Sequence, residues 1–183
     1  VSEDVKRLFS EKINNIQTKI SVIPNGYDND DFNKVNLIRD PETFYISYVG
    51  TISDDYPING FISALTMLDK EIRDKLKLRF VGKLATPHLN ELVKAGLEEN
   101  IEQLGYVHHN LAIDYMFSSD ILLLVIPDIK NNKGILTGKL FEYLASKRPI
   151  LLLGPTDGDA ATIINETNSG IICSYTDTEK IKE

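Results

Sequence analysis

Residues 134–149, GILTGKLFEYLASKRP, decide the fold because they connect two strongly apolar runs of the chain. Residues 121–127 (ILLLVIP) precede this stretch, and residues 150–153 (ILLL) follow it directly. Short apolar runs bounded by turn residues indicate buried strands, and the spacing of apolar residues between them indicates an amphipathic helix. We therefore interpret the stretch as a helix that crosses between two parallel strands.

The start of this helix carries residues suited to an anionic ligand. Thr137, Gly138 and Lys139 stand where the helix begins, and Glu142 lies one turn further on. Free N–H groups and the positive end of the helix dipole gather at a helix start, and phosphate groups bind there. A carboxylate accepts hydrogen bonds from hydroxyl groups. The pattern predicts a ligand that carries both phosphate and hydroxyl groups.

The rest of the chain repeats the same alternation of strand and helix. We expect strands at residues 44–50, 76–82, 101–107, 121–126, 150–153 and 171–174, with helices at residues 59–68, 86–97, 111–117, 139–146 and 158–167. This alternation predicts an α/β fold, a doubly wound, Rossmann-like parallel sheet of six strands with helices on both faces. Such sheets bind ligands at the carboxyl ends of their strands. The first strand leads into GTIS at residues 50–53 and not into a GxGxxG fingerprint, which is evidence against a nicotinamide or flavin enzyme.

The segment before the first of these strands is organised differently. Residues 2–15 have helical spacing with Ser2 as a candidate N-cap, residues 19–24 (KISVIP) alternate like a short strand, and residues 27–36 are polar and acidic. We expect one domain over residues 1–183, with the helix, short strand and loop in residues 1–40 and the strand–helix repeats in residues 44–183. A start at Val1 and an end within a helical pattern suggest a piece of a longer protein.

Single residues also suggest where two helices begin or end. Thr86 and Pro87 suit the cap and the first position of the helix at residues 86–97. Asp159 lies near the start of the helix at residues 158–167, and Gly170 suits the stop after it.

The composition excludes several classes of protein. The net charge of −7 does not suit a general nucleic-acid binder, whose surface must be basic. Cys173 is the only cysteine, so the chain has no internal disulfide and no cysteine-based zinc cluster, and a reducing, cytoplasmic compartment fits best. Apolar runs of about seven residues are far shorter than the ~20 that span a bilayer, and no signal peptide is recognisable.

A series of short motifs, in this order, resembles one protein family. They are SVIPNGYDNDDF (residues 21–32), YVGTI (48–52), LRFVGK (78–83), IEQLGYVHH (101–109) and GKLFEYLASKRPILLL (138–153). Together they resemble the C-terminal, donor-binding domain of group 1 (family 4) glycosyltransferases, which have the GT-B fold. Each motif alone is a weak signal, but the series covers nearly the whole chain in register.

The resemblance implies a function and a set of site residues. The chain would bind a nucleoside-diphosphate sugar for transfer of the sugar to an acceptor hydroxyl in glycan biosynthesis, and an N-terminal acceptor-binding domain would be missing. Glu142 would bind the ribose hydroxyls, and Val107 and His109 would meet the nucleobase. The diphosphate would lie against Thr137, Gly138, Lys139 and Leu140, with Gly50 close to the ligand. No metal cofactor is expected, no catalytic residue can be assigned, and membrane contact would come only through the missing half.

The chain departs from the family pattern on the phosphate side of this site. Gly134 stands where many members have a glutamate, eight residues before Glu142. Thr51 replaces an arginine, and the lysine that usually precedes the next glycine, here Gly60, is missing. Lys139 and, more weakly, Lys83 are then the candidate cations for the phosphates. We expect the isolated domain to bind its donor weakly and to catalyse little.

Other interpretations stay open at this stage. A degenerate relative that serves as a non-catalytic α/β binding module would fit the missing cations, and an epimerase of the UDP-sugar type would share the fold. His108 and His109 are adjacent, so at a strand end their side chains point apart and a shared metal is not expected. Asp54 and Asp55 resemble an acidic metal pair but have no third ligand at a suitable spacing, which favours a polar loop.

Overall fold

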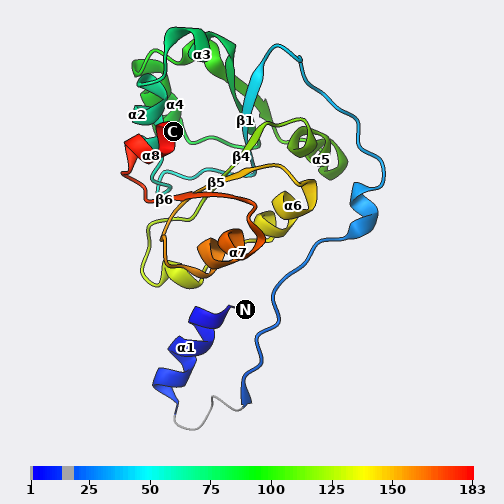
Figure 1. Ribbon diagram of the computed structural model, residues 1–183, viewed down its shortest axis with the longest axis vertical. Helices are drawn as coiled ribbons and strands as arrows, with labels where there is room; N and C mark the ends of the chain where they lie inside the picture. The colour runs from blue at the N-terminus through cyan, green and yellow to red at the C-terminus, as the bar shows by residue number, and fades with distance from the viewer. Residues whose placement is uncertain (1, 14–18) are drawn as a thin grey trace.

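The computed structural model describes residues 2–13 and 19–183 (Figure 1). At its centre is a six-stranded sheet in the order β3-β2-β1-β4-β5-β6, and each neighbouring pair of strands is parallel. The strands are β1 (Phe44–Val49), β2 (Leu76–Val81), β3 (Ile101–Gly105), β4 (Ile121–Val125), β5 (Ile150–Leu153) and β6 (Gly170–Cys173). The predicted doubly wound, Rossmann-like sheet is confirmed.

Helices cover both faces of this sheet. One face carries α2 (Asn59–Thr66), α4 (Thr86–Lys94) and α8 (Thr178–Lys182), and the other carries α5 (His109–Phe117), α6 (Gly138–Ser146) and α7 (Asp159–Thr167). The core is accordingly divided into two clusters, and β4 contributes to both: Leu123 and Val125 face the first set of helices, Leu122 and Leu124 the second. β4 is therefore apolar without alternation because both of its faces are buried.

The remaining elements are short or lie at the periphery. They are α1 (Glu3–Lys12), η2 (Asn29–Phe32), α3 (Lys70–Lys75), η3 (Glu98–Asn100) and η4 (Asn132–Gly134). None of the helices in residues 2–13 and 19–183 combines the length and the apolar character needed to cross a bilayer.

β1 and β4 form a narrow seam at the point where the strand order changes direction. Only two residue pairs join these strands, Ile46 with Ile121 and Ser47 with Leu122. Asp120 closes the amino end of the seam, since its carboxylate accepts from the Tyr45 amide at 2.8 Å and its own amide donates to the Tyr45 carbonyl at 2.9 Å. Beyond the seam, β1 leads to one face of the sheet and β4 to the other, and sheets of this kind have their ligand crevice at the carboxyl ends of the two strands that diverge in this way.

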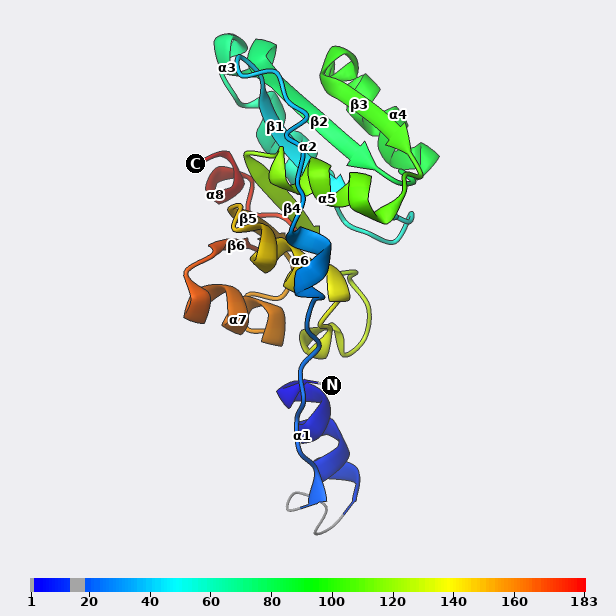
Figure 2. The same cartoon turned by 90° about the vertical axis from the view of Figure 1, so that its right-hand side faces the viewer.

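The N-terminal residues lie outside the sheet. Figures 1 and 2 both show α1 standing apart from the sheet, below α7, and residues 19–43 running back past α6 and α5 to β1. Two side chains of the α5 region hold the end of this segment: Asp114 Oδ1 accepts from the Asn36 amide at 2.8 Å, and Ser118 Oγ accepts from the Ile38 amide at 2.7 Å. The segment therefore borders the helices that flank the crevice.

Some predicted element bounds were wrong. Residues 19–24 form no strand, because they run outside a sheet whose edges are β3 and β6, and alternation alone cannot hold a strand that has no neighbour to pair with. The helix expected from residue 111 begins at His109, and the strand before it ends at Gly105, which has a φ of 64°. The short helix α3 was not predicted.

The cap predictions were partly right. Ser2 caps α1 as expected, with its side chain accepting from the Val5 amide at 3.4 Å. Ala85 and not Thr86 is the cap residue of α4, which already begins at position 86. Gly170 does not stop α7: Asn168 takes the left-handed conformation there, with a φ of 48°, and Gly170 is the first residue of β6.

Gly170 is required by the pairing of β6 with β5. A Cβ atom at this position would lie 1.9 Å from the Ile150 carbonyl oxygen. We expect Gly170→Ala to lower the free energy of unfolding by about 2–3 kcal/mol, because the clash is with backbone that cannot move without breaking the strand pair. Urea unfolding measures the change. Gly26→Ala is the matched control, since nothing lies within 4 Å of a Cβ atom there, and equal effects in the two variants would contradict the prediction.

Candidate functional site

Lys139, in the first turn of α6, reaches across the crevice to β1. Its Nζ donates to Tyr48 Oη at 2.6 Å and lies 3.8 Å from the centre of the Tyr48 ring. A Cβ atom on Gly50 would lie 2.8 Å from the same Nζ, so the ammonium group sits against the turn that follows β1. Burial lowers the pKa of Lys139 to about 8, and the nearby Glu142 carboxylate acts in the opposite direction. A partly desolvated cation thus lies at the carboxyl end of the seam.

Tyr143 fixes the same helix to β1 from inside the core. Its side chain is fully buried, and its hydroxyl accepts from the Val49 amide at 2.9 Å. Val49 lies beyond the paired residues of the seam, so the tyrosine supplies an acceptor at a point where β1 and β4 have separated. Burial raises the pKa of Tyr143, which keeps the phenol neutral. This hydrogen bond fixes the position of α6 relative to the carboxyl end of β1.

Glu142 is the second charged residue of this helix start, and it is partly buried. Burial raises the pKa of its carboxyl group, while the charges of His109 and Lys139 oppose that increase. His109 is the first residue of α5, and its Nε2 lies 3.0 Å from Asp31 Oδ2 in the N-terminal segment. Asp31 raises the pKa of Glu142 further because the two carboxylates repel. These four residues form one charged cluster drawn from three parts of the chain.

The other predicted residues at the start of α6 differ in their surroundings. Thr137 is the cap residue, but its side chain does not cap the helix, and its buried Oγ1 has no hydrogen-bond partner within the described ranges. Gly138 is exposed, and a Cβ atom there would lie 3.5 Å from Asn25 Nδ2. Leu140 is fully buried, so its side chain belongs to the core, and its amide already donates to the Thr137 carbonyl at 3.1 Å.

Thr51 and Lys83 lie together beside this cluster, in a cavity of about 610 Å³. The cavity lies between the turns that follow β1 and β2, and its polar lining also includes Ser53, Asp54, Asp55 and Thr86. The two turns are joined by a hydrogen bond from the Ile52 amide to the Lys83 carbonyl at 2.8 Å. Thr51 Oγ1 lies 3.4 Å from Tyr106 Oη, just after β3. Val107, in contrast, is partly buried and packs against the core.

Three residues of this neighbourhood were not among the predicted site residues. Tyr48 has the pattern of an ordinary buried strand residue, because aromatic residues are frequent in strands. Asp31 and Asn25 lie in a polar segment whose position over α5 and α6 depends on the tertiary structure. The one signal in the sequence that could have included these two is the motif SVIPNGYDNDDF, which spans both.

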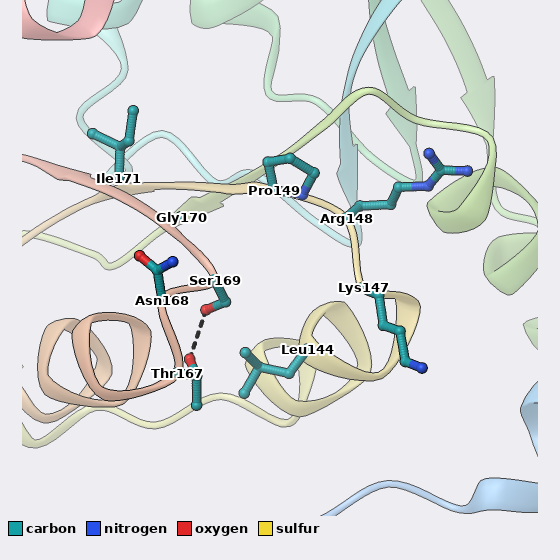
Figure 3. Close-up of a pocket in the computed structure, with 9 residues that line it drawn as sticks. All are labelled: Leu144, Lys147, Arg148, Pro149, Thr167, Asn168, Ser169, Gly170 and Ile171. Carbon is teal, nitrogen blue, oxygen red and sulfur yellow. Dashed lines mark hydrogen bonds between the residues drawn. The ribbon is translucent and has the colours of Figure 1, made fainter.

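Within residues 2–13 and 19–183, no three His, Cys, Asp or Glu side chains come together in a way that could hold a metal ion. A second cavity, of about 580 Å³, lies at the other end of the sheet (Figure 3). It is bordered by Leu144 and Lys147 of the α6 end and by Pro149 and Ile171 near the amino ends of β5 and β6. Since the crevice opens at the carboxyl ends, this cavity is not part of the candidate site.

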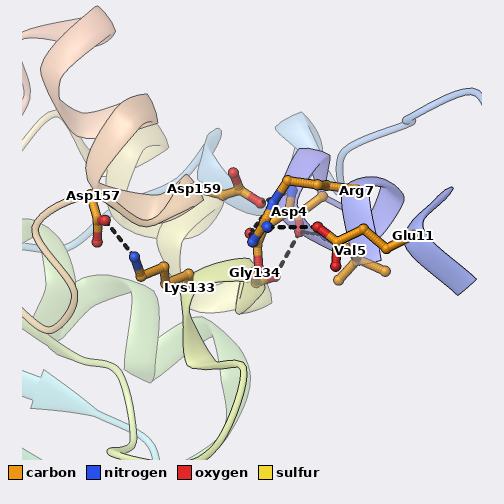
Figure 4. A network of polar contacts seen from close by, with 9 residues as sticks. Asp4, Val5, Arg7, Glu11, Lys133, Gly134, Asp157 and Asp159 are labelled. Carbon is orange, nitrogen blue, oxygen red and sulfur yellow. Dashed lines mark hydrogen bonds and ion pairs between the residues drawn. The ribbon is translucent and has the colours of Figure 1, made fainter. Parts of the chain in front are cut away.

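The N-terminal end of α1 contacts the rest of the chain at Gly134 and at Asp159 (Figure 4). Ser2 Oγ donates to the Gly134 carbonyl at 2.8 Å, and a Cβ atom on Gly134 would lie 3.0 Å from Ser2 Oγ and from Val5 Cγ2. Asp159 Oδ2 accepts from the Asp4 amide at 2.9 Å, which places a carboxylate at the positive end of α1. The close packing of α1 therefore explains why a glycine suits position 134 in this chain.

No family model matches the chain, and no curated protein matches it by sequence. Solved structures with the same fold include WaaG, a glycosyltransferase involved in lipopolysaccharide biosynthesis, with a TM-score of 0.79 and 16% identity over 100% of this chain and 50% of WaaG. HepE from Anabaena, in complex with UDP and glucose, gives a TM-score of 0.72 and 14% identity over 99% of this chain and 50% of HepE.

The C-terminal domain of LpcC, a glycosyl transferase group 1 family protein from Francisella tularensis, gives a TM-score of 0.57 and 19% identity over 76% of this chain and 71% of that domain's chain. This chain therefore has the fold of one half of a GT-B glycosyltransferase, as the sequence motifs predicted. It spans about half the length of WaaG and of HepE.

A side chain at position 134 should displace α1. We expect Gly134→Glu to leave the sheet folded but to speed proteolysis within residues 3–12 by about tenfold, which corresponds to a loss of ~1.4 kcal/mol in local stability. Limited proteolysis with mass spectrometry measures the cleavage rate. Gly26→Glu makes the same chemical change at a position where nothing lies within 4 Å of a Cβ atom. Unchanged cleavage in Gly134→Glu would show that the contact does not hold α1.

Proposed function

We propose that this chain is the donor-binding half of a glycosyltransferase and that it binds a nucleoside-diphosphate sugar at the crevice between β1 and β4. The observation that carries the proposal is the charged pair at the start of α6, where Lys139 meets β1 and Glu142 follows one turn later. An ammonium group at a helix start suits a diphosphate, and a carboxylate beside it suits the vicinal hydroxyls of a ribose. The fold shared with HepE, which was solved with UDP, supports the same proposal.

Each end of the ligand has its own set of residues. Glu142 accepts hydrogen bonds from the two ribose hydroxyls, and His109 with the backbone at Val107 borders the nucleobase. The first N–H groups of α6 and the ammonium group of Lys139 bind the diphosphate beside Gly50. Thr51, Lys83, Thr137 and Gly138 complete the proposed phosphate side.

Sugar transfer is a displacement at the anomeric carbon. The bond from this carbon to the phosphate oxygen breaks, and negative charge accumulates on the leaving diphosphate. Lys139 and the N–H groups of the helix start stabilise that charge as it develops. The acceptor hydroxyl forms the new bond and gives its proton to a base, which we place outside this chain together with acceptor recognition. The chain alone would then bind donor weakly and turn over little.

A non-catalytic binding module with the same fold is the second candidate. The observation that favours it is the short supply of cations at the phosphate side, where Thr51 stands after β1 and Gly134 is covered by α1. Titration with UDP and with GDP separates the two candidates. Binding of either nucleotide supports a donor site, and failure of both to bind at millimolar concentration favours the module.

Glu142 should confer selectivity for ribose. We expect Glu142→Gln to weaken UDP binding by about tenfold, because a neutral amide replaces a charged acceptor. Isothermal titration calorimetry compares UDP with 2′,3′-dideoxy-UDP, which the native chain should bind about tenfold more weakly and the variant should bind as well as UDP. Glu166→Gln, on the exposed side of α7, is the control. A native chain that makes no distinction between the two nucleotides contradicts the ribose role.

Lys139 should make nucleotide binding dependent on pH. Its pKa of about 8 leaves the side chain mostly charged near pH 7 and mostly neutral near pH 9, whereas a terminal phosphate, with a second pKa of about 6, is ionised throughout. UDP affinity should therefore fall about tenfold as the pH rises from about 7 to 9, since the cation is lost. Lys139→Arg stays charged over this range and should bind UDP equally at both values. A flat profile in the native chain would refute the phosphate role of Lys139.

A further inference from the structure

Tyr48 contacts both Lys139 and the turn that follows β1. The residue is only 1% exposed and lies one position before the end of β1. Its Oη accepts from Lys139 Nζ at 2.6 Å, and the ammonium group lies 3.8 Å from the centre of its ring. The hydroxyl proton of Tyr48 is donated to the Thr51 carbonyl at 3.0 Å. One phenol therefore binds the cation and fixes the turn at the same time.

Lys139 needs a partner of this kind because two effects disfavour its charge. Burial penalises the ammonium form, and the side chain starts from the first turn of α6, where the helix dipole is positive. A phenol oxygen accepts a hydrogen bond from an ammonium group, and the face of the ring attracts a cation. Both contacts of Tyr48 therefore stabilise the charged form of Lys139.

Whether the charge of Lys139 can act on a ligand depends on whether its hydrogen-bond partner is itself charged. Burial raises the pKa of Tyr48 above its ordinary value, so the phenol stays neutral and is not a counter-ion. A carboxylate in its place would also hold the lysine but would cancel its charge. Gly50 adds to the effect: with a φ of 123° and no side chain, it lets the ammonium group approach the backbone of the turn. The cation is held in place and its charge remains available to an anion.

We propose that Tyr48 is the positioning residue for Lys139, and that it presents the ammonium group, without neutralising it, to the diphosphate of the donor at Gly50 and Thr51. The ligand in this inference rests on the proposed function. Tyr48 acts on the ligand through Lys139 alone, and its buried ring makes no contact with the ligand.

The test compares a ligand that carries a diphosphate with one that lacks it. Tyr48→Phe keeps the ring and removes the hydroxyl, so we expect it to bind UDP about 3- to 10-fold more weakly, which is the worth of about one hydrogen bond. Uridine, followed by NMR chemical-shift titration, should bind the variant and the native chain equally. In the Lys139→Ala background, Tyr48→Phe should cause no further loss of UDP affinity, because the two residues act as one unit.

Tyr45→Phe is the matched control. Tyr45 is another buried tyrosine of β1, and its Oη accepts from the Asp40 amide at 3.3 Å at the far end of the strand. This variant should bind UDP as the native chain does. UDP affinity that is unchanged in Tyr48→Phe, equal losses for UDP and uridine, or a full additional loss in the Lys139→Ala background would each overturn the proposal.

A second measurement needs no nucleotide. Lysine side chains are labelled and titrated by NMR, and the Lys139 signal is identified by its absence from Lys139→Arg. In Tyr48→Phe this signal should titrate at lower pH than in the native chain, because a hydrogen bond to the charged form is lost. An unchanged titration would overturn the positioning role. If neither UDP nor GDP binds the native chain, the proposed function fails, and this titration still decides whether Tyr48 holds Lys139.

Discussion

The attachment of α6 to β1 is the contact on which the rest of the molecule depends. β1 and β4 share only two residue pairs, so the sheet is weakest where the candidate site lies. Asp120 reinforces the amino end of this seam, and the hydroxyl of Tyr143 accepts the Val49 amide at the carboxyl end. A buried amide left without that acceptor would cost about 1–3 kcal/mol. The same bond orients the helix that carries Lys139 and Glu142, so the core and the site share one set of contacts.

Much of the fold could be predicted because local patterns of apolar and polar residues determine it. The apolar runs of β4 and β5 and the amphipathic spacing of α6 identify a parallel strand–helix–strand unit without further information. Two of the errors lie where the outcome depends on distant residues. Residues 19–24 alternate like a strand but lie beyond the edge of the sheet, and Gly170 looks like a helix stop although its lack of a side chain is required by the Ile150 carbonyl.

The residues of the candidate site also fall into two groups, those that the local sequence predicts and those that depend on the fold. Lys139, Glu142 and Gly138 could be predicted because they are neighbours in sequence on one helix start. Tyr48 and Asp31 could not, since a strand residue and a loop residue come to this helix only through the fold. Gly134 shows that comparison with a family pattern alone can mislead. The absence of the family's glutamate suggests a lost function, whereas the surroundings of Gly134 show that α1 occupies the space of a side chain.

The narrow seam also has a consequence for the dynamics of the chain. It separates three strands before residue 106 from three strands after residue 120, and its contacts close a loop of 75 residues between Tyr45 and Asp120. Contacts between residues so far apart in sequence are costly in entropy, because the long loop between them must be closed. A strand pair held by two residue pairs also opens more easily than the longer strand pairs of this sheet. Both core clusters extend across the seam and α8 packs on α2, so the two halves stay together when the seam opens, and amide exchange at the seam is governed by this local opening. A ligand bound across the crevice would slow that opening, so that occupancy of the site and cooperativity of the whole domain would rise together.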